Sequence, residues 1–479
     1  MNTKNKKSVF LTTLFATLLL FTLLTPFIGV HFFVFPVYDD YWYAEVVSNH
    51  GFLGALDWWR NNASGRFLAT LIISISNYSV KSIFLHRLLL LLLSLFFVVS
   101  TWVLIKSILR SLLIISLWEI WFLFMIFLFC FVSSLPGISE VLYWLPGAAT
   151  YILGISFINI LISLLIKTKQ KPTKISFLAI VLVSICACGT SEITGIFIIG
   201  LLFLTSFQLT KTENKSKNIF FSIYFYIFLG ITFFLLVIVL KAPGNAIRFH
   251  LESRVNPEVG NSFFAFKSAL LSTLKFIYNL FFIKRIFILT IPLSIWLLLV
   301  DVFPNQKFEF ILKFKFKFLL SVQFFLILFT FLTFFSYSFS TGLWLPIQRI
   351  MSLIHYLWLL NFLLCVFLFS LWIKPWISNF VVISNGGFII SLIIFLTLFI
   401  SAKQNNTSRL IIDMQNSNYS KYCIYMKKQR SFFQNGNEHL VKNQKPPSRP
   451  MIYVWDLADE NYKTRYFEYY SNSLNKKSK

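Results

Sequence analysis

The residues in this sequence that most clearly suggest chemistry are Asp39-Asp40-Tyr41, directly after a long apolar segment. That segment, Val9 to Phe35, is long enough to cross a bilayer, and three lysines precede it. Lysines before a first span hold that end in the cytoplasm, so we expect the acid pair on the opposite face. Adjacent carboxylates there suit a general base, or ligands of a divalent metal such as Mg²⁺ or Mn²⁺, acting on a lipid-borne substrate.

Other polar and aromatic residues fall in loops predicted on the same side of the membrane. Glu140 and Glu192 supply further carboxylates that could assist Asp39 or Asp40 in catalysis. Transfer of a sugar from a polyprenyl phosphate needs a carboxylate to accept a proton and cations to stabilise the leaving phosphate. The predicted substrate- and phosphate-binding residues are Tyr41, Arg66, Trp144, Asn245, Arg248, His250 and Arg349.

Each of these residues also has a purely structural interpretation. Asp39-Asp40 could cap a helix, Arg66 could mark the start of an interfacial helix, and Glu140 could be a solvated loop charge. Glu192 is different, because it lies between two apolar runs and is costly to place there without a partner or a function. Pro243-Gly244-Asn245 is an ordinary turn signal.

Composition places the chain among polytopic membrane proteins. Hydrophobic residues make up 57% of it, charged residues only 13%, and the mean hydropathy is +0.73. The net charge of +25 comes from short basic clusters between apolar runs, which is typical of cytoplasmic loops, so we expect no nucleic-acid partner. The five cysteines show neither metal-ligand spacing nor a disulfide framework.

The elements that must position these side chains are therefore membrane helices. We predict an all-α transmembrane bundle of about eleven spans, with the N-terminus inside and the C-terminus outside. Residues 1–401 form the membrane domain, with 36–81 as the first outer loop, and 402–479 form a short extracytoplasmic tail. Interfacial helices are expected in that loop and over 263–283. The predicted spans are 9–35, 83–105, 112–132, 148–166, 175–188, 193–210, 219–240, 286–302, 318–337, 350–373 and 380–400.

This order of a first span, an outer acid pair, many further spans and an outer tail resembles the GT-C class of membrane glycosyltransferases. The resemblance places the acid motif of that class on Asp39 and Asp40, and its second outer acid on Glu140. The chain is also similar to a bacterial family of polytopic membrane proteins that share short motifs in the same order. In this sequence the motifs are Asp39-Asp40-Tyr41, Gly65-Arg66, Trp144-Leu145-Pro146-Gly147-Ala148 with Tyr151, Glu192, and Ala242-Pro243-Gly244-Asn245 with Arg248.

The resemblance implies an inverting glycosyltransferase with an aspartate base, facing the outer side of the bacterial inner membrane. Its partners would be a polyprenyl-phosphate-linked sugar, a surface glycan or glycolipid acceptor such as polysaccharide or lipopolysaccharide, and membrane lipid. The sequence requires no cofactor, and a divalent metal is an option. The alternatives are a flippase or transporter of lipid-linked glycans, which a charge inside a span such as Glu119 would favour, and a polymerase or ligase of such glycans.

Overall fold

The computed structural model describes residues 3–37, 39–112, 115–170, 173–209, 215–300, 308–377, 384–434 and 450–451. Every regular element within these ranges is helical, and no strand occurs in them. The chain divides into two compact units, each built from three separate stretches of sequence. The first unit comprises Met1–Thr25, Thr101–Pro136 and Val255–Ser408, and the second comprises Pro26–Ser100, Gly137–Arg254 and Arg409–Lys479.

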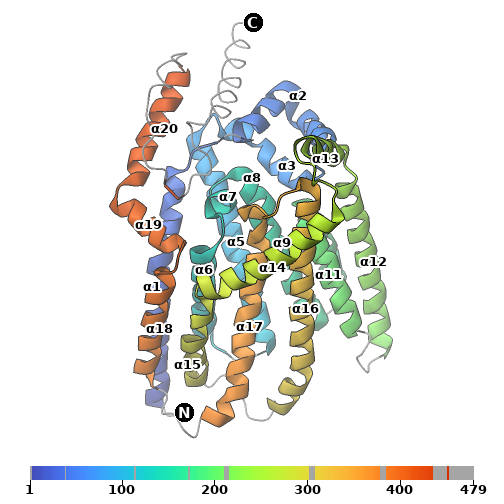
Figure 1. Ribbon diagram of the computed structural model, residues 1–479. Helices are drawn as coiled ribbons and strands as arrows, with labels where there is room; N and C mark the ends of the chain where they lie inside the picture. Colours follow the sequence, from blue (N-terminus) through green and yellow to red (C-terminus); the bar gives the residue numbers. More distant parts are fainter. Residues whose placement is uncertain are drawn as a thin grey trace. The chain divides into compact units, whose positions relative to one another are not determined.

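The first unit is made of long apolar helices, labelled in Figure 1. Parts of α1 (Thr3–Gly29), α5 (Ile83–Leu112) and α19 (Asn406–Gln415) belong to it. Its other helices are α6 (Leu117–Ser134), α14 (Ser262–Tyr278), η3 (Asn279–Ile283), η4 (Ile286–Leu289), α15 (Thr290–Val300), α16 (Phe308–Thr341), η6 (Gln348–Ile350), α17 (Met351–Ile377) and α18 (Asn385–Ile400).

The second unit contains the acid motif and most of the other candidate residues. The remaining parts of α1, α5 and α19 belong to it. Its other helices are η1 (Val30–Phe33), α2 (Asp39–Asn62), α3 (Phe67–Ser74), α4 (Ser76–Ser79), α7 (Ile138–Leu142), α8 (Leu145–Gly147), η2 (Ala148–Ile152), α9 (Leu153–Gln170), α10 (Lys174–Cys188), α11 (Glu192–Leu209), α12 (Lys215–Leu240), α13 (Pro243–Val255) and α20 (Asn418–Gln434).

Seven of the described helices are long and apolar enough to cross a membrane, or eight if the bent pair α12 and α13 is one span. The chain is thus a helical membrane protein, whereas the count of eleven spans and their orientation remain predictions. Several predicted spans form shorter apolar helices in the described residues. The seven candidates are Lys7–Phe33, Ile83–Ser111, Leu117–Ser134, Leu145–Thr168, Ser262–Ile283, Leu320–Thr341 and Gln348–Ser370.

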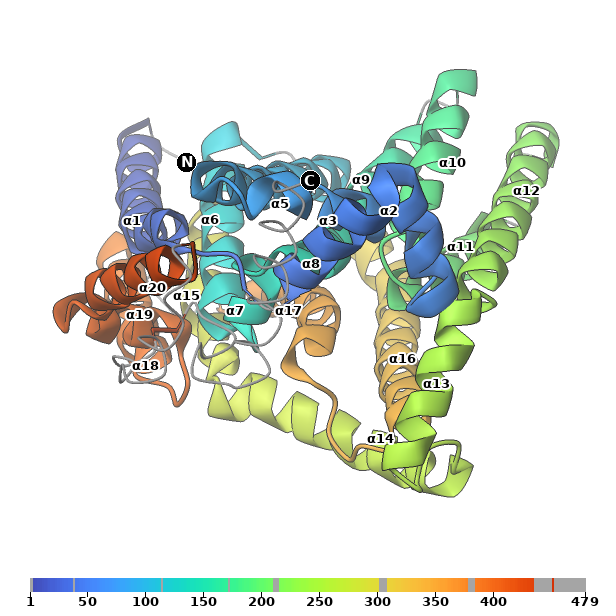
Figure 2. The same cartoon turned by 90° about the horizontal axis from the view of Figure 1, so that it is seen from above.

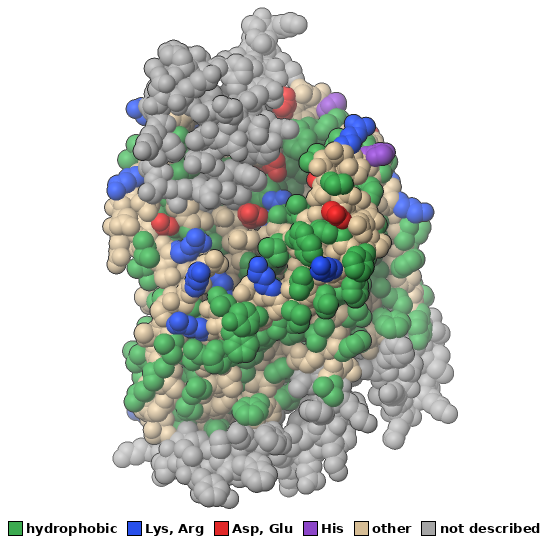
Figure 3. All heavy atoms as spheres, in the orientation of Figure 1, with side chains coloured by type: hydrophobic (Ala, Val, Ile, Leu, Met, Phe, Trp, Pro, Cys, Tyr) green, Lys and Arg blue, Asp and Glu red, His purple; other side chains and the backbone are tan. Residues whose placement is uncertain are grey.

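Helix α14 meets the length and composition of a span but lies across its neighbours. Figures 1 and 2 both show it running transverse to α16 and α17 of the same unit. Several of its apolar side chains are exposed, including Phe263 and Leu274, and lysines accompany apolar side chains on the face drawn in Figure 3. Lys267 lies 5.8 Å from the centre of the Trp344 ring. The interfacial helix expected over 263–283 stays a prediction, since the same segment is one of the seven candidate spans.

Several buried polar contacts in the first unit are made by uncharged side chains and join segments that are distant in sequence. Asn406 donates from its side-chain amide to the carbonyl oxygens of Val132 and Leu135, at 2.8 and 2.9 Å. Ser134 Oγ lies 2.9 Å from His355 Nε2. The chain after α18 is therefore attached at the end of α6 by hydrogen bonds, because the last carbonyls of a helix lack partners within it.

Two local expectations from the sequence need correction. Pro243-Gly244-Asn245 is the first turn of helix α13 and not a loop turn, since proline is well suited to the first position of a helix. Glu119 does not sit deep in a span. Its carboxylate accepts the Ser116 backbone N–H at 2.6 Å and closes a capping box at the start of α6.

Candidate functional site

The acid motif forms the start of α2, and Asp40 fixes that start. Asp40 Oδ2 accepts the backbone N–H of Val37 at 2.7 Å, while the Asp40 N–H donates to the Val37 carbonyl at 2.7 Å. The Asp40 side chain is fully buried, and its Oδ1 has no hydrogen-bond partner among the described residues. Burial raises the pKa of Asp40 well above its ordinary value, and Asp39 adds to this, although the Val37 hydrogen bond opposes it.

Asp39 has a different environment from its neighbour. It is only partly buried, whereas both Asp40 and Tyr41 are buried. Tyr43 lies one helical turn after Asp39, so the two side chains share a face of α2. Asp39 is therefore the member of the acid pair that a substrate can reach.

A divalent metal at the acid motif, the option that the sequence leaves open, stays a prediction. The described residues contain no group of three or more His, Cys, Asp or Glu side chains arranged to hold an ion. Because Asp40 is enclosed and bonded to Val37, Asp39 alone offers an accessible carboxylate. A magnesium ion there would depend on substrate and water oxygens for its other ligands, so we derive no step through a metal.

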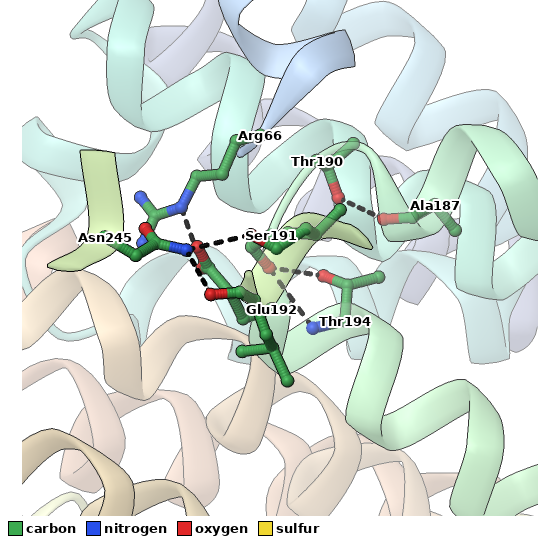
Figure 4. Close-up of polar contacts among 9 residues, drawn as sticks. Arg66, Ala187, Thr190, Ser191, Glu192, Thr194 and Asn245 are labelled. Atoms are coloured by element: carbon green, nitrogen blue, oxygen red, sulfur yellow. Dashed lines mark hydrogen bonds and ion pairs between the residues drawn. The ribbon is translucent and has the colours of Figure 1, made fainter. Parts of the chain in front are cut away.

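Arg66 and Glu192 form an ion pair, drawn in Figure 4. Arg66 Nε donates to Glu192 Oε2 at 2.8 Å, and the two side chains are 26% and 17% exposed. Burial alone would lower the pKa of Arg66, but the charge of Glu192 raises it overall. Burial likewise would raise the pKa of Glu192, yet Arg66 lowers it overall. Both groups are thus held in their charged forms.

A second cation and two phenols lie around this pair. Arg248 is close enough to Arg66 and Glu192 to act on both through its charge. Tyr43 and Tyr151 are likewise close enough to Arg66 and Arg248 to interact with them electrostatically. Burial raises the pKa of Tyr43, and the charge of nearby Asp39 adds to the effect. The cluster therefore brings two guanidinium groups and the ion-paired Glu192 carboxylate close to Tyr43, which also lies near Asp39.

Close backbone contacts position Arg66 relative to α12 and α13. A Cβ on Gly65 would collide with the Val239 carbonyl oxygen, and a Cβ on Gly244 would collide with the Ala63 backbone nitrogen. The two glycines therefore allow the loop before Arg66 and the α12–α13 junction to pack against each other, backbone to backbone. Any side chain at either position would push Arg66 away from its partners.

Asn245 is used at this junction for structure. Its side-chain amide donates to the carbonyls of Val239 and Leu240, at 2.8 and 3.2 Å, and so caps the end of α12 (Figure 4). This contact stabilises the 49° bend between α12 and α13. The predicted role of Asn245 in substrate binding remains a prediction, and its amide hydrogens already have these partners.

Glu192 is positioned by the turn between α10 and α11. The Gly189 carbonyl accepts the backbone N–H groups of Leu68 and Ala69, at 2.9 and 3.2 Å, which joins the turn to α3. Ser191, directly before Glu192, accepts the Thr194 backbone N–H at 3.2 Å and caps α11 (Figure 4). The first residue of α11 is therefore held next to the helix that begins after Arg66.

Four other predicted site residues lie on or beside other helices: Glu140, Trp144, His250 and Arg349. Glu140 on α7 is partly buried and Trp144 is buried; the segment they occupy leads into η2, which carries Tyr151. His250 is exposed on α13. Arg349 lies on η6 and belongs to the first unit, whereas the cluster belongs to the second.

Sequence reasoning missed Tyr43 and gave Tyr151 no role of its own. The spacing of Asp39 and Tyr43, four residues apart in a segment that forms a helix, is the signal that could have identified Tyr43. Comparison of the chain with protein-family models, with curated proteins and with solved structures finds no match. The function must therefore be argued from the site itself.

Proposed function

We propose that the protein is a GT-C-like membrane glycosyltransferase that moves a sugar from a polyprenyl phosphate to a surface glycan or glycolipid. The observation that carries the proposal is the Arg66–Glu192 ion pair with Arg248 beside it, next to the helix that starts with Asp39. Fixed charge of mixed sign is costly in a membrane protein and usually serves a substrate. The site would face the periplasm or exterior from the inner membrane.

Asp39 is proposed as the base because Asp40 is enclosed and tied to Val37. The acceptor hydroxyl gives its proton to the Asp39 carboxylate while its oxygen attacks the anomeric carbon of the donor sugar. The bond from that carbon to the phosphate oxygen breaks, and the electron pair leaves with the polyprenyl phosphate. Attack from the face opposite the phosphate inverts the anomeric configuration.

The two guanidinium groups of the cluster are proposed to stabilise the leaving phosphate. Arg248 is exposed, so its guanidinium group can contact the phosphate directly, whereas the guanidinium group of Arg66 is oriented by Glu192. Fixed cations placed where negative charge develops lower the barrier, since they need no reorganisation during the reaction. Glu192 would thus act on the substrate through Arg66.

Aromatic rings on α2 are suited to hold the sugar. Tyr43 stacks on Trp59 with ring centres 3.9 Å apart, and Trp58 packs edge-on against Trp59 at 4.9 Å. Trp58 remains partly exposed. Exposed faces of such rings favour contact with the apolar face of a pyranose, and Trp58 is the residue available for it.

The test is a transfer assay with purified protein in liposomes, a polyprenyl-phosphate sugar and extracted acceptor lipid. We expect sugar transfer by the unchanged protein and a fall of about 10²–10⁴ in turnover for Asp39→Asn, the typical cost of losing a general base. Asp57→Asn is the matched control, because Asp57 is an exposed aspartate on the same helix. It should keep full turnover.

The alternatives give different results in the same liposomes. Movement of the intact donor across the bilayer without transfer of its sugar would identify a flippase and overturn the proposal. Joining of preformed oligosaccharides in place of single sugars would identify a polymerase or ligase. Equal turnover in Asp39→Asn and Asp57→Asn would show that Asp39 is not the base.

A further inference from the structure

A second group of basic residues lies in the second unit, where α5 begins. His86 is fully buried, and its Nδ1 lies 3.4 Å from Ser79 Oγ. Its other ring nitrogen, Nε2, is buried and has no hydrogen-bond partner among the described residues. A buried ring nitrogen without a partner loses the hydrogen bond that water would give it, which is costly unless a ligand replaces it.

Arg87 follows His86, and only some of the N–H donors of its guanidinium group have partners. Its Nε donates to the Val34 carbonyl at 2.9 Å, and its guanidinium carbon lies 5.0 Å from the centre of the Phe35 ring. These contacts fix the plane of the guanidinium group. Its Nη2 is buried and has no partner among the described residues, so one edge of the group keeps its donors available.

Arg430 reaches the same segment from α20. Its Nη2 donates to the carbonyls of Val80 and Lys81, at 2.8 and 3.0 Å. Its Nη1 is buried and, like Arg87 Nη2, has no partner among the described residues. A residue more than 300 positions away along the chain thus presents unused donors beside the start of α5.

The charges in this group are not balanced. Both Arg87 and Arg430 are close enough to His86 to act on it through their charge. In the part of the chain that the structure describes, neither Arg87 nor Arg430 forms an ion pair with a carboxylate. Two partly enclosed guanidinium groups without a counter-charge repel each other and favour an anion.

An apolar stripe runs along α5 away from this group. Phe84, Leu88 and Leu92 are 75%, 36% and 53% exposed, and their spacing of four residues places them on one side of the helix. The helix is one of the candidate spans. Cations at the end of a span lie at the depth of lipid phosphates, and the exposed stripe below them lies at the depth of acyl chains.

We propose that Arg87, Arg430 and His86 form a binding site for the phosphate group of a membrane lipid, whose chain lies along Phe84, Leu88 and Leu92. The phosphate oxygens accept hydrogen bonds from Arg87 Nη2 and Arg430 Nη1, the donors that the protein leaves unused. This site is separate from the Arg66–Glu192 pair and does not depend on the proposed transfer reaction.

The test measures lipid binding to the delipidated full-length protein in detergent by native mass spectrometry. The probes are phosphatidylglycerol, undecaprenyl phosphate, diacylglycerol and inorganic phosphate. We expect the two phosphate-bearing lipids to bind about tenfold or more tightly than diacylglycerol, as one charge-assisted hydrogen bond implies. Preference for one of the two identifies the source of the phosphate.

The variants separate this site from a merely structural one. Arg430→Gln should weaken binding of both phosphate lipids about tenfold while diacylglycerol binding is unchanged. Arg409→Gln, at an exposed arginine of the same unit, is the matched control and should bind all four probes as the unchanged protein does. If Arg430→Gln fails to fold, Arg430→Lys should keep the fold and bind with intermediate affinity.

Three results would overturn the proposal. The first is equal affinity of the unchanged protein for diacylglycerol and phosphatidylglycerol. The second is full retention of lipid binding by folded Arg430→Gln. The third is inorganic phosphate binding as tightly as the lipids and displacing them, which would identify a soluble anion site.

Discussion

Buried polar groups serve different purposes in the two units. In the first unit the hydrogen bonds of Asn406 and His355 join uncharged side chains to carbonyls or hydroxyls. In the second unit Arg66 and Glu192 keep full charges, with Arg248 beside them. Neutral contacts satisfy backbone groups at helix ends at little cost, whereas charges in a membrane protein are expensive.

The difference shows where function should be sought. A network that only joins helices needs no charge, and Asn406 bonds two carbonyl oxygens without any. A buried ion pair often stabilises a fold no better than well-packed neutral groups would, so the charges of the second unit are the place to look for a function. Substitutions in the two regions should therefore affect different properties.

After the loss of turnover predicted for Asp39→Asn, the largest effect is expected from Arg66. Arg66→Gln removes the ion-pair partner of Glu192 and one cation from the proposed phosphate site, so the KM for donor should rise about tenfold or more. Arg66→Lys should lose less, because the charge survives while the guanidinium geometry is lost. Steady-state kinetics with the polyprenyl-phosphate sugar measure both. Equal KM values for all three proteins would remove Arg66 from the site.

The next largest effect is expected from Asn406 in the first unit, and it should change stability without changing turnover. Asn406→Ala leaves the carbonyls of Val132 and Leu135 without their donor and should lower the free energy of unfolding by about 1–3 kcal/mol. Turnover per folded molecule should stay the same. Thermal unfolding in detergent, followed by the transfer assay below the midpoint, checks both. A changed KM with an unchanged midpoint would contradict the structural role.

A smaller and pH-dependent effect is expected from Asp40. Its pKa in the folded protein is raised, so its contribution to stability is present below the unfolded pKa and is lost as the pH rises through the folded pKa. Asp40→Asn removes this titration and can still accept the Val37 N–H. The variant should thus be at least as stable as the unchanged protein at neutral pH, with no such advantage in acid.

Unfolding midpoints of both proteins across the pH range test this. A loss of stability in Asp40→Asn that is the same at every pH would show that the carboxylate has no raised pKa. Turnover should fall much less than in Asp39→Asn, because the enclosed Asp40 is not the proposed base.

The smallest effect is expected at His250. The side chain is exposed on α13, and exposed substitutions away from special contacts change stability by less than about 0.5 kcal/mol. His250→Ala should also keep its turnover within about twofold, a barrier change below about 0.5 kcal/mol. A larger loss in the transfer assay would add His250 to the site, as the sequence analysis first suggested.

The sequence predicted the helical membrane class, and it predicted either a partner or a function for Glu192, of which the structure shows the partner. Apolar runs identify spans by composition, and a carboxylate between two such runs needs a partner. The sequence could not reveal that Gly65 packs against the backbone of Val239, or Gly244 against that of Ala63. This close approach depends on segments far apart in the chain. The helix at Pro243 was missed because proline and glycine are also turn residues, and only the packing decides between the two.

The different environments of Asp39 and Asp40 were also beyond the sequence. Two adjacent aspartates look equivalent until the backbone turn before α2 encloses one of them. The group of Arg87, Arg430 and His86 could not be predicted either. Arg430 belongs to a segment that composition describes only as a polar tail, and the fold brings it to the start of α5.

The central claim is that the charged residues of the second unit perform chemistry while the neutral contacts of the first unit hold the fold. Its most direct test is turnover per folded molecule for Asp39→Asn and Asn406→Ala, measured in one preparation with unfolding midpoints alongside. We expect Asp39→Asn to lose about 10²–10⁴ in turnover with an unchanged midpoint, and Asn406→Ala to show the reverse. Full turnover in folded Asp39→Asn would contradict the account.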